Sequence, residues 1–387
     1  MVGTALALAL VLQTAVGPPA TPRFDAATFD PLVQAGITGG AYPGAALVVG
    51  LVDTVLFARG YGHLTWSTLS PRVDPDSTLY DLASLTKVVA TTTALMLLVD
   101  RGKVRLEAPV VTYIPEFHGP GTAAITVRGL LTHTSGLRST LPLYREADSA
   151  AALRQVFAAS PIVPPGTRVI YSDLNAILLG EIVRRAAREP LEVFTTREIL
   201  TLLGLQQTLF RPPRALRPRI APTGLWHGQS VAGVVNDRNA VRLGGVAGHA
   251  GLFATARDVA RFAQFILRGG TTLDGRRLVL AETVRLFTTK AADFGRGSEV
   301  RALGWQAVPT GEHTSSAGVL FGPRSVGHTG WTGTSLWIDP DRGLFVVLLT
   351  NRAYAPRTRT SFTVLKEVRG RLADAAARAH DAPPSPP

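Results

Sequence analysis

Apolar positions near both ends of the chain follow the pattern of β-strands. Residues 45–51 and 54–59 are rich in β-formers and are separated by Val52 and Asp53, which predicts a hairpin. Both runs are mostly apolar, so we expect a sheet that is covered on both faces. Turn residues then favour a meander in the last part of the chain. Its three predicted strands lie at 325–329, 333–339 and 344–351.

Helical spacing of apolar residues is typical of several other segments. A short helix is predicted at 24–35, and a longer one from Ser84 to Asp100 repeats apolar residues with few polar positions. The longer helix is therefore expected to be buried. Further helical patterns occur at 151–159, 176–187 and 364–375.

The order of these elements predicts an α/β (α+β) fold. An antiparallel sheet flanked by N- and C-terminal helices, with an inserted mainly helical lobe, accounts for strands at both ends of the chain. We expect one domain at 23–381, with the α/β part at about 23–100 and 244–380 and the helical lobe at about 101–243. A ligand site is expected in the cleft where the two parts meet.

The two chain ends lie outside this predicted domain. Residues 1–22 contain the apolar stretch Val2 to Val16 followed by small residues, which predicts a signal peptide and an exported, periplasmic or extracellular protein. No Lys or Arg precedes the stretch, so an uncleaved leader or a different start site remains an alternative. No later stretch is expected to span a membrane. Residues 382–387 are Pro-rich and are expected to be disordered.

Composition excludes several kinds of chemistry. The formal net charge is +12, but 36 of the 40 basic residues are scattered arginines, and no basic run carries interleaved aromatics. We therefore interpret the charge as a solvated surface and expect no nucleic-acid partner. The chain has no cysteine, which excludes disulfides, thiolate metal sites and cysteine nucleophiles. Reactive groups must come from Ser, His, Tyr, Lys or carboxylates.

The first candidate for chemistry is Ser84-Leu85-Thr86-Lys87, at the start of the predicted buried helix. A serine at a helix start has its Oγ near unpaired N–H groups and the positive end of the helix dipole, which stabilise a developing oxyanion. Lys87 follows on the same helical face, so its amine can take the Ser84 proton if desolvation lowers its pKa. The four residues alone also fit a helix-capping serine beside a surface lysine.

A second candidate is Tyr171, which precedes a predicted helix within Tyr171-Ser172-Asp173. A tyrosine at such a junction can relay a proton if a nearby cation favours its phenolate. Taken alone, the segment is better explained by a packed tyrosine with a helix-capping Ser172 or Asp173.

A third candidate is His328-Thr329-Gly330, at the end of a predicted strand. The small glycine lets a substrate lie against the strand edge, and His328 and Thr329 offer hydrogen bonds. The N–H of Trp331 is a candidate oxyanion donor. The position of the segment directly before the last two predicted strands of the meander favours a functional role.

These segments, in this order, resemble the three signature motifs of class C β-lactamases, DD-peptidases and related esterases: Ser84-x-x-Lys87, Tyr171-x-Asp173 and His328-Thr329-Gly330. Residues 130–137 and 248–256 are also similar to recurring segments of this family, so the resemblance covers roughly residues 25–375. The absence of G-x-S-x-G and of a His pair with metal-ligand spacing disfavours an α/β-hydrolase and a metallohydrolase.

The resemblance implies acylation of Ser84 and hydrolysis of the acyl-enzyme, without metal or cofactor. Lys87 and Tyr171 would share the proton transfers, and the N–H groups of Ser84 and Trp331 would form the oxyanion hole. The implied activity is cleavage of peptide, amide or ester bonds in a small-molecule or peptide substrate, of which peptidoglycan-derived D-alanyl peptides are one example. A small-ester hydrolase and a penicillin-binding or peptide-sensing protein without turnover are the alternatives.

Two residues depart from the family pattern. Asp173 replaces an asparagine, and its carboxylate is expected to pair with Lys87, to hold it protonated and to shift the base role toward Tyr171. His328 stands where β-lactamases more often have lysine, and a mostly neutral histidine binds a substrate carboxylate less firmly. We therefore expect poor β-lactamase activity.

Other polar residues are predicted to have structural roles. His133 and His249 lie in Gly- and Thr-rich loops, and of the two His249 is expected to line the cleft. Asn351 and Arg352 follow a strand, where they either hold a carboxylate or lie on the surface.

Overall fold

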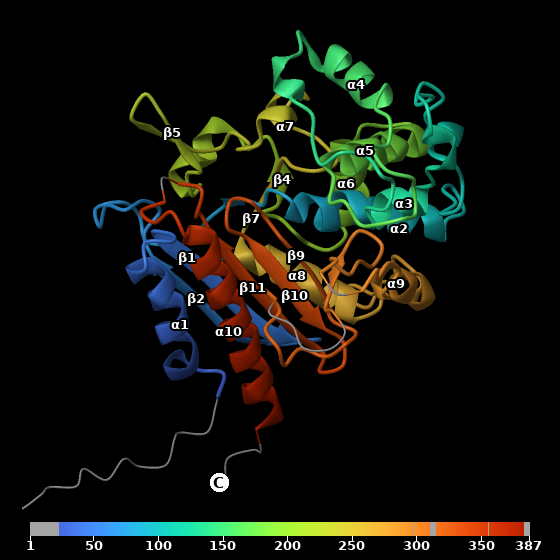
Figure 1. The fold of residues 1–387 in the computed structure, drawn as a ribbon. Helices are drawn as coiled ribbons and strands as arrows, with labels where there is room; N and C mark the ends of the chain where they lie inside the picture. Colours follow the sequence, from blue (N-terminus) through green and yellow to red (C-terminus); the bar gives the residue numbers. More distant parts are fainter. Residues whose placement is uncertain (1–22, 296, 310–314, 355, 383–387) are drawn as a thin grey trace, which may run out of the picture.

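The computed structural model describes residues 23–295, 297–309, 315–354 and 356–382 (Figure 1). The predicted leader at 1–22 and residues 383–387 of the predicted tail lie outside the described residues. Within the described ranges, no helix is both long and apolar enough to cross a membrane.

A six-stranded antiparallel sheet joins the two ends of the chain. Its order is β2-β1-β11-β10-β9-β8, so β1 lies between its hairpin partner β2 and the late strand β11. The predicted hairpin is present, and β9, β10 and β11 form the predicted meander. The strands are β1 (Gly44–Leu51), β2 (Val55–Gly62), β8 (Gln306–Ala307), β9 (Val326–Thr329), β10 (Ser335–Asp339) and β11 (Leu344–Thr350).

Helices cover both faces of this sheet, as its apolar strands require (Figure 1). Side chains alternate along each strand, so Leu47 and Val49 pack with the first and last helices, whereas Val48 and Val347 point to the opposite face. The covering helices are α1 (Ala26–Thr38) and α10 (Ser361–Asp381) on one face and α8 (Ala256–Leu267) on the other.

The middle of the chain is mainly helical. Its helices are α3 (Val127–Leu131), α4 (Ser149–Phe157), α5 (Asp173–Ala187), α6 (Leu191–Thr195) and α7 (Arg238–Arg242). Its strands are short, and β4 (Leu209–Phe210) joins β3 (Tyr80–Asp81) and β7 (Leu252–Ala254) in a three-stranded sheet, while β5 (Gly224–Trp226) and β6 (Gln229–Val231) form a hairpin. The lobe boundaries near 101 and 243 stay a prediction.

The predicted buried helix is present and runs between the two parts of the molecule. It begins at Leu85, continues as the π-helical segment η1 (Lys87–Thr92) and ends with α2 (Thr93–Asp100), which contacts α5 and α9 (Ala281–Thr288). Its apolar side chains join one hydrophobic core with residues of the sheet and of the helical lobe. The fold therefore holds the start of this helix in a fixed place beside the sheet.

Candidate active site

A strained turn places Ser84 at the helix start. The preceding residue, Ala83, has φ +48°, a conformation that alanine rarely adopts. The buried carboxylate of Asp81 fixes the turn, because its Oδ1 accepts the Ala83 N–H at 2.9 Å and its Oδ2 accepts the Asn236 N–H at 2.7 Å. Thr334 Oγ1 also donates to the Leu82 carbonyl at 2.9 Å, which ties the meander to this turn.

Lys87 lies directly behind Ser84 and is buried. Its Nζ donates to Ser84 Oγ at 3.0 Å, to Asp173 Oδ1 at 2.8 Å and to the His249 carbonyl at 3.3 Å. The predicted pairing with Asp173 is therefore present, and all three ammonium protons have acceptors.

The ion pair decides the charge of Lys87. Burial lowers the pKa of its amine, but the charges of Asp173 and Tyr171 and the hydrogen bonds to them raise it by more, so the net shift is upward. Lys87 is thus an ammonium in the free protein, as Asp173 led us to expect. In this state it donates a hydrogen bond to Ser84 Oγ, which it can thereby polarise.

Tyr171 lies just before α5, where it faces Lys87 and two histidines. The Lys87 Nζ is 5.0 Å from the centroid of its ring, and the His133 and His328 ring centroids are 4.7 Å and 5.9 Å away. The neighbouring Ser172 Oγ donates to the Arg138 carbonyl at 2.7 Å and does not cap the helix. The structure thus brings together three segments that are far apart in the sequence.

The third predicted segment, at the end of β9, also lies beside Ser84. His328 on β9 is buried, and burial, then the charges of Arg301 and Lys87, hold its pKa well below the usual value, so the ring is neutral. Gly330 packs so closely that a Cβ there would lie 2.6 Å from the Leu82 carbonyl oxygen. Only glycine therefore lets Thr329 and Trp331 approach the Ser84 turn this closely.

Two N–H groups are available to an oxyanion. Within the described part of the chain, the backbone N–H groups of Ser84 and Trp331 donate to no other residue. The Trp331 side chain is 62% exposed and lies at the rim of the cleft.

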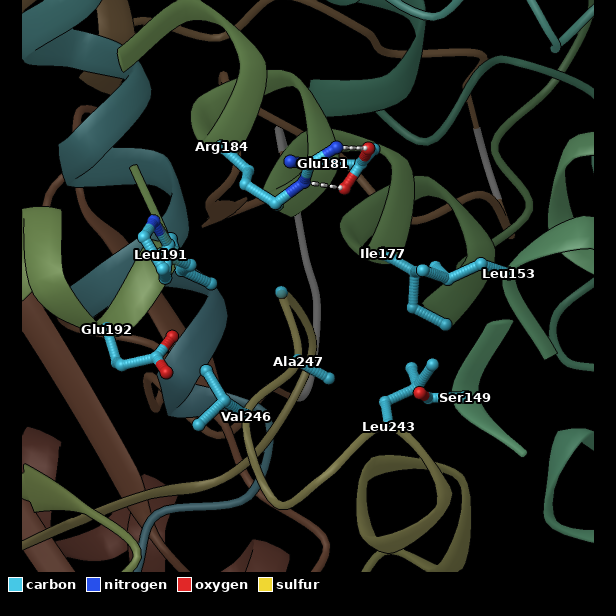
Figure 2. Close-up of a pocket in the computed structure, with 13 residues that line it drawn as sticks. Ser149, Leu153, Ile177, Glu181, Arg184, Leu191, Glu192, Leu243, Val246 and Ala247 are labelled. Atoms are coloured by element: carbon cyan, nitrogen blue, oxygen red, sulfur yellow. Dashed lines mark hydrogen bonds and ion pairs between the residues drawn. The ribbon is translucent and has the colours of Figure 1, made fainter. Parts of the chain in front are cut away.

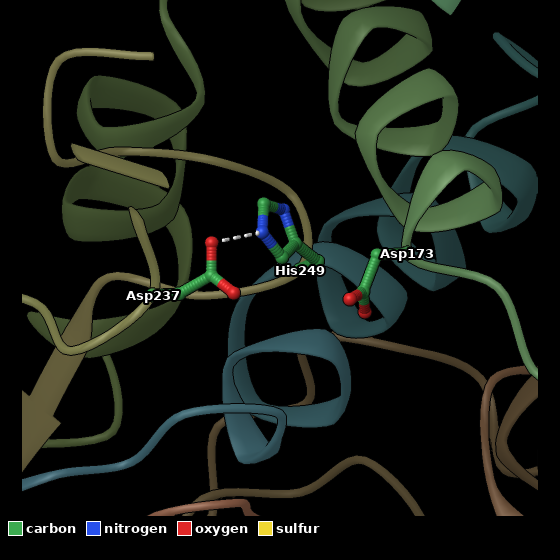
Figure 3. Close-up of side chains that lie close together, drawn as sticks. All are labelled: Asp173, Asp237 and His249. Carbon is green, nitrogen blue, oxygen red and sulfur yellow. Dashed lines mark hydrogen bonds and ion pairs between the residues drawn. The ribbon is translucent and has the colours of Figure 1, made fainter. Parts of the chain in front are cut away.

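His249 lies elsewhere than predicted. Its side chain is only 1% exposed and points to Asp237, whose Oδ1 is 2.9 Å from Nε2 (Figure 3). Burial raises the pKa of Asp237, but the hydrogen bond and charge of His249 lower it by more, to about 2. His249 contacts Lys87 through its backbone carbonyl, which accepts a hydrogen bond from Nζ.

Asp173, Asp237 and His249 place their donor atoms within 4.8 Å of one another. Such oxygen and imidazole donors bind divalent ions. The Lys87 ammonium is the cation that already contacts this group, at 2.8 Å from Asp173. The group is therefore explained by the Lys87 ion pair.

The Ser84 cleft is an open pocket of about 350 Å³ between β9 and α10. Besides Ser84, Tyr171 and the His328–Trp331 segment, its lining includes residues that sequence reasoning missed: Glu299, Arg301, Gln306, Ser316, Phe362, Lys366 and Arg369. None lies in a motif, and nothing in the sequence distinguishes Arg301 or Arg369 from the other arginines.

A second pocket of about 210 Å³ is lined by residues of α5 and by the 246–248 segment (Figure 2). Its charged residue Arg184 is paired with Glu181 at 2.6 Å. The pocket does not include Ser84, and we assign it no role.

The prediction that Asn351 and Arg352 lie on the surface was wrong. The two side chains are 1% and 5% exposed, so neither lies on the surface. Asn351 Nδ2 donates to the Leu64 and Pro222 carbonyls, and Arg352 donates to the Trp331 carbonyl and to Ser361. Both side chains turn inward and donate to backbone carbonyls, and Arg352 in this way supports the segment after Gly330.

His133 makes stability depend on pH. Its Nδ1 accepts the Ser172 N–H at 3.2 Å, and burial, then the charges of Arg301, Lys87 and His328, hold its pKa well below 6.5. Below about pH 6.5, His133 takes up a proton in the unfolded chain but stays neutral in the folded chain. We therefore expect His133 to remove up to about 1 kcal/mol of unfolding free energy per pH unit as the pH falls below about 6.5.

A His133→Asn variant tests this expectation. Asparagine tolerates the φ of +58° at this position and offers an oxygen in place of Nδ1. Urea unfolding at about pH 7.5 and about pH 5.5 should show a smaller loss of stability in the variant than in the wild type. Equal losses in both proteins would show that His133 is protonated without penalty.

The fold and the grouped side chains are those of a serine hydrolase of the penicillin-recognising class. Residues 29–368 match the sequence model of the Beta-lactamase family, and the chain belongs to this family. The predictions of the fold class and of a serine hydrolase are thereby confirmed.

Three known proteins are similar to this chain in sequence or in fold. The chain is 33% identical over 354 residues to a putative D-alanyl-D-alanine carboxypeptidase of Escherichia coli K12, covering 81% of this chain and 80% of that protein. A penicillin-binding protein homologue from Caulobacter crescentus shares the fold with a TM-score of 0.72 and 22% identity, covering 90% and 96% of the two chains. The hydrolase EstCE1 has a TM-score of 0.70 at 20% identity, covering 89% and 98%.

Proposed function

We propose that the protein is an exported hydrolase that cleaves D-alanyl peptides through an acyl-enzyme on Ser84. The observation that carries the proposal is the Lys87 ammonium, held by Asp173 and donating to Ser84 Oγ at 3.0 Å. A serine held in this way at a helix start, next to two free N–H groups, is arranged for acyl transfer.

Tyr171 acts as the general base in acylation. Its phenolate takes the Ser84 proton as Oγ bonds to the substrate carbonyl carbon, and the N–H groups of Ser84 and Trp331 hold the resulting oxyanion. When the intermediate collapses, the C–N bond breaks and Tyr171 returns the proton to the leaving amine. Water then attacks the ester carbonyl while the same residue takes its proton, and this proton passes to Ser84 Oγ as the acyl–oxygen bond breaks.

The charge of Lys87 is essential to these steps. As an ammonium it cannot accept a proton, but it favours the Tyr171 phenolate and the developing negative charge on Ser84 Oγ. Asp173 keeps it charged, and the His249 carbonyl keeps it in place.

The substrate class is supported by the carboxypeptidase name of the Escherichia coli relative and by the export signal predicted at 1–22. One feature favours a second candidate: His328 is neutral, so the cleft lacks a cation at that position for a substrate carboxylate. Hydrolysis of small neutral esters is therefore the alternative activity of the same site.

A substrate panel decides between the two. The purified protein should release D-Ala from a diacyl-lysyl-D-Ala-D-Ala peptide faster than it hydrolyses p-nitrophenyl acetate at the same protein concentration. Mass spectrometry should detect a transient acyl adduct on Ser84. Ester turnover without D-Ala release would replace the peptidase with an esterase, and a stable adduct without turnover would indicate a binding protein.

A further inference from the structure

Arg301 is a buried cation at the floor of the Ser84 cleft. Its side chain is 3% exposed, it lines the pocket, and its guanidinium carbon lies 5.0 Å from the centroid of the Tyr171 ring. It precedes β8 and has no part in the three sequence motifs.

The guanidinium is poorly neutralised. Nη2 pairs with Glu299, whose side chain is 49% exposed and therefore well hydrated. Among the described residues, Nε and Nη1 are buried and have no hydrogen-bond partner. Burying a charge with two unsatisfied donors is costly, so a compensating interaction is expected when the enzyme works.

The groups around Tyr171 indicate which interaction compensates for the buried charge of Arg301. The facing ionisable groups are Lys87 from the buried helix, His133 from the loop after α3, His328 from β9 and Arg301. Lys87 shares its charge with Asp173, and burial together with the charge of Arg301 keeps both histidines neutral. Arg301 is thus the cation at the Tyr171 ring that has no buried carboxylate as a partner.

We propose that Arg301 is a positioning residue that stabilises the Tyr171 phenolate. A cation near an aromatic ring is attracted to its π-electrons, and the attraction grows when the ring carries negative charge in a desolvated site. Because His328 is neutral, Arg301 supplies the second positive charge, after Lys87, that lets Tyr171 act as a base. The inference rests on the proposed role of Tyr171 and identifies the residue that sustains it.

The test compares Arg301→Met, which removes the charge, with the charge-conserving Arg301→Lys. The readout is the rate of Ser84 modification by a fluorophosphonate probe, which has no carboxylate, between about pH 5 and 9. Arg301→Met should react about tenfold to thirtyfold more slowly at neutral pH, with the acidic limb of the profile about one pH unit higher. Arg301→Lys should recover most of the rate, and Arg301→Met should add little to a Tyr171→Phe variant.

Other outcomes overturn the inference. Equal rates in the wild type and Arg301→Met exclude a role for the charge, as does a slower rate with an unshifted profile that Arg301→Lys fails to recover. A loss seen with fluorescent penicillin but not with the fluorophosphonate would make Arg301 an anchor for the substrate carboxylate instead. If Arg301→Met does not fold, Arg301→Gln replaces it, with circular dichroism as the check. A wild type that reacts with neither probe overturns the proposed function, and this inference with it.

Discussion

Replacing Ser84 by alanine should abolish hydrolysis. We expect kcat/KM to fall by about 10⁴-fold or more, because the variant lacks the hydroxyl on which the proposed acyl-enzyme forms. Among the serines that the structure describes, Ser84 is the one that accepts a hydrogen bond from the Lys87 ammonium and lies at the start of the buried helix. The substitution removes only Oγ, so the ion pair between Lys87 and Asp173 and the fold should remain.

The measurement combines steady-state rates with covalent labelling. Neither a fluorescent penicillin nor a fluorophosphonate should modify the Ser84→Ala variant. Ser316→Ala is the matched control, because this serine lines the same cleft without contact to Lys87, and it should label like the wild type. Undiminished labelling of Ser84→Ala would remove Ser84 from the mechanism.

Local spacing explains why part of this site could be predicted from the sequence. Ser84 and Lys87 are one turn apart on a helix that the apolar repeat marks as buried, so their contact follows from helical geometry. The approach of Tyr171 and His328 does not follow from spacing, because both are far away along the chain. Only the family resemblance pointed to it. In the structure, the packing of α5 against the buried helix places Tyr171, and β9 of the six-stranded sheet places His328.

The remaining features depend on tertiary contacts that leave no sequence pattern. Arg301 reaches Tyr171 across 130 residues, and in a chain with 36 arginines composition cannot single it out. The pairing of His249 with Asp237 was hidden for the same reason, since either residue alone fits a loop. The π-helical segment at Lys87 also has no signal in the sequence, because all six of its residues are buried and leave no exposed face that would reveal the wider turn.

A Tyr171→Phe substitution should lower kcat/KM by about 10²- to 10⁴-fold, the usual contribution of a general base. Phenylalanine keeps the ring that contacts His133 and Lys87 but has no oxygen to receive the Ser84 proton. Ser84 should still be present for slow labelling, so the variant separates loss of the base from loss of the nucleophile. Pre-steady-state acylation rates with the peptide substrate measure the effect.

Asp173 determines how large this effect is. Replacing Asp173 by asparagine removes the main charge that raises the pKa of Lys87, and the opposing effect of burial then lowers that pKa. A neutral Lys87 amine 3.0 Å from Ser84 Oγ can take its proton, so Tyr171→Phe should cost much less in the Asp173→Asn protein than in the wild type. An equal loss in both backgrounds would mean that Lys87 never becomes the base. In the proposed mechanism, residue 173 therefore decides which side chain receives the proton, through the charge that it imposes on Lys87.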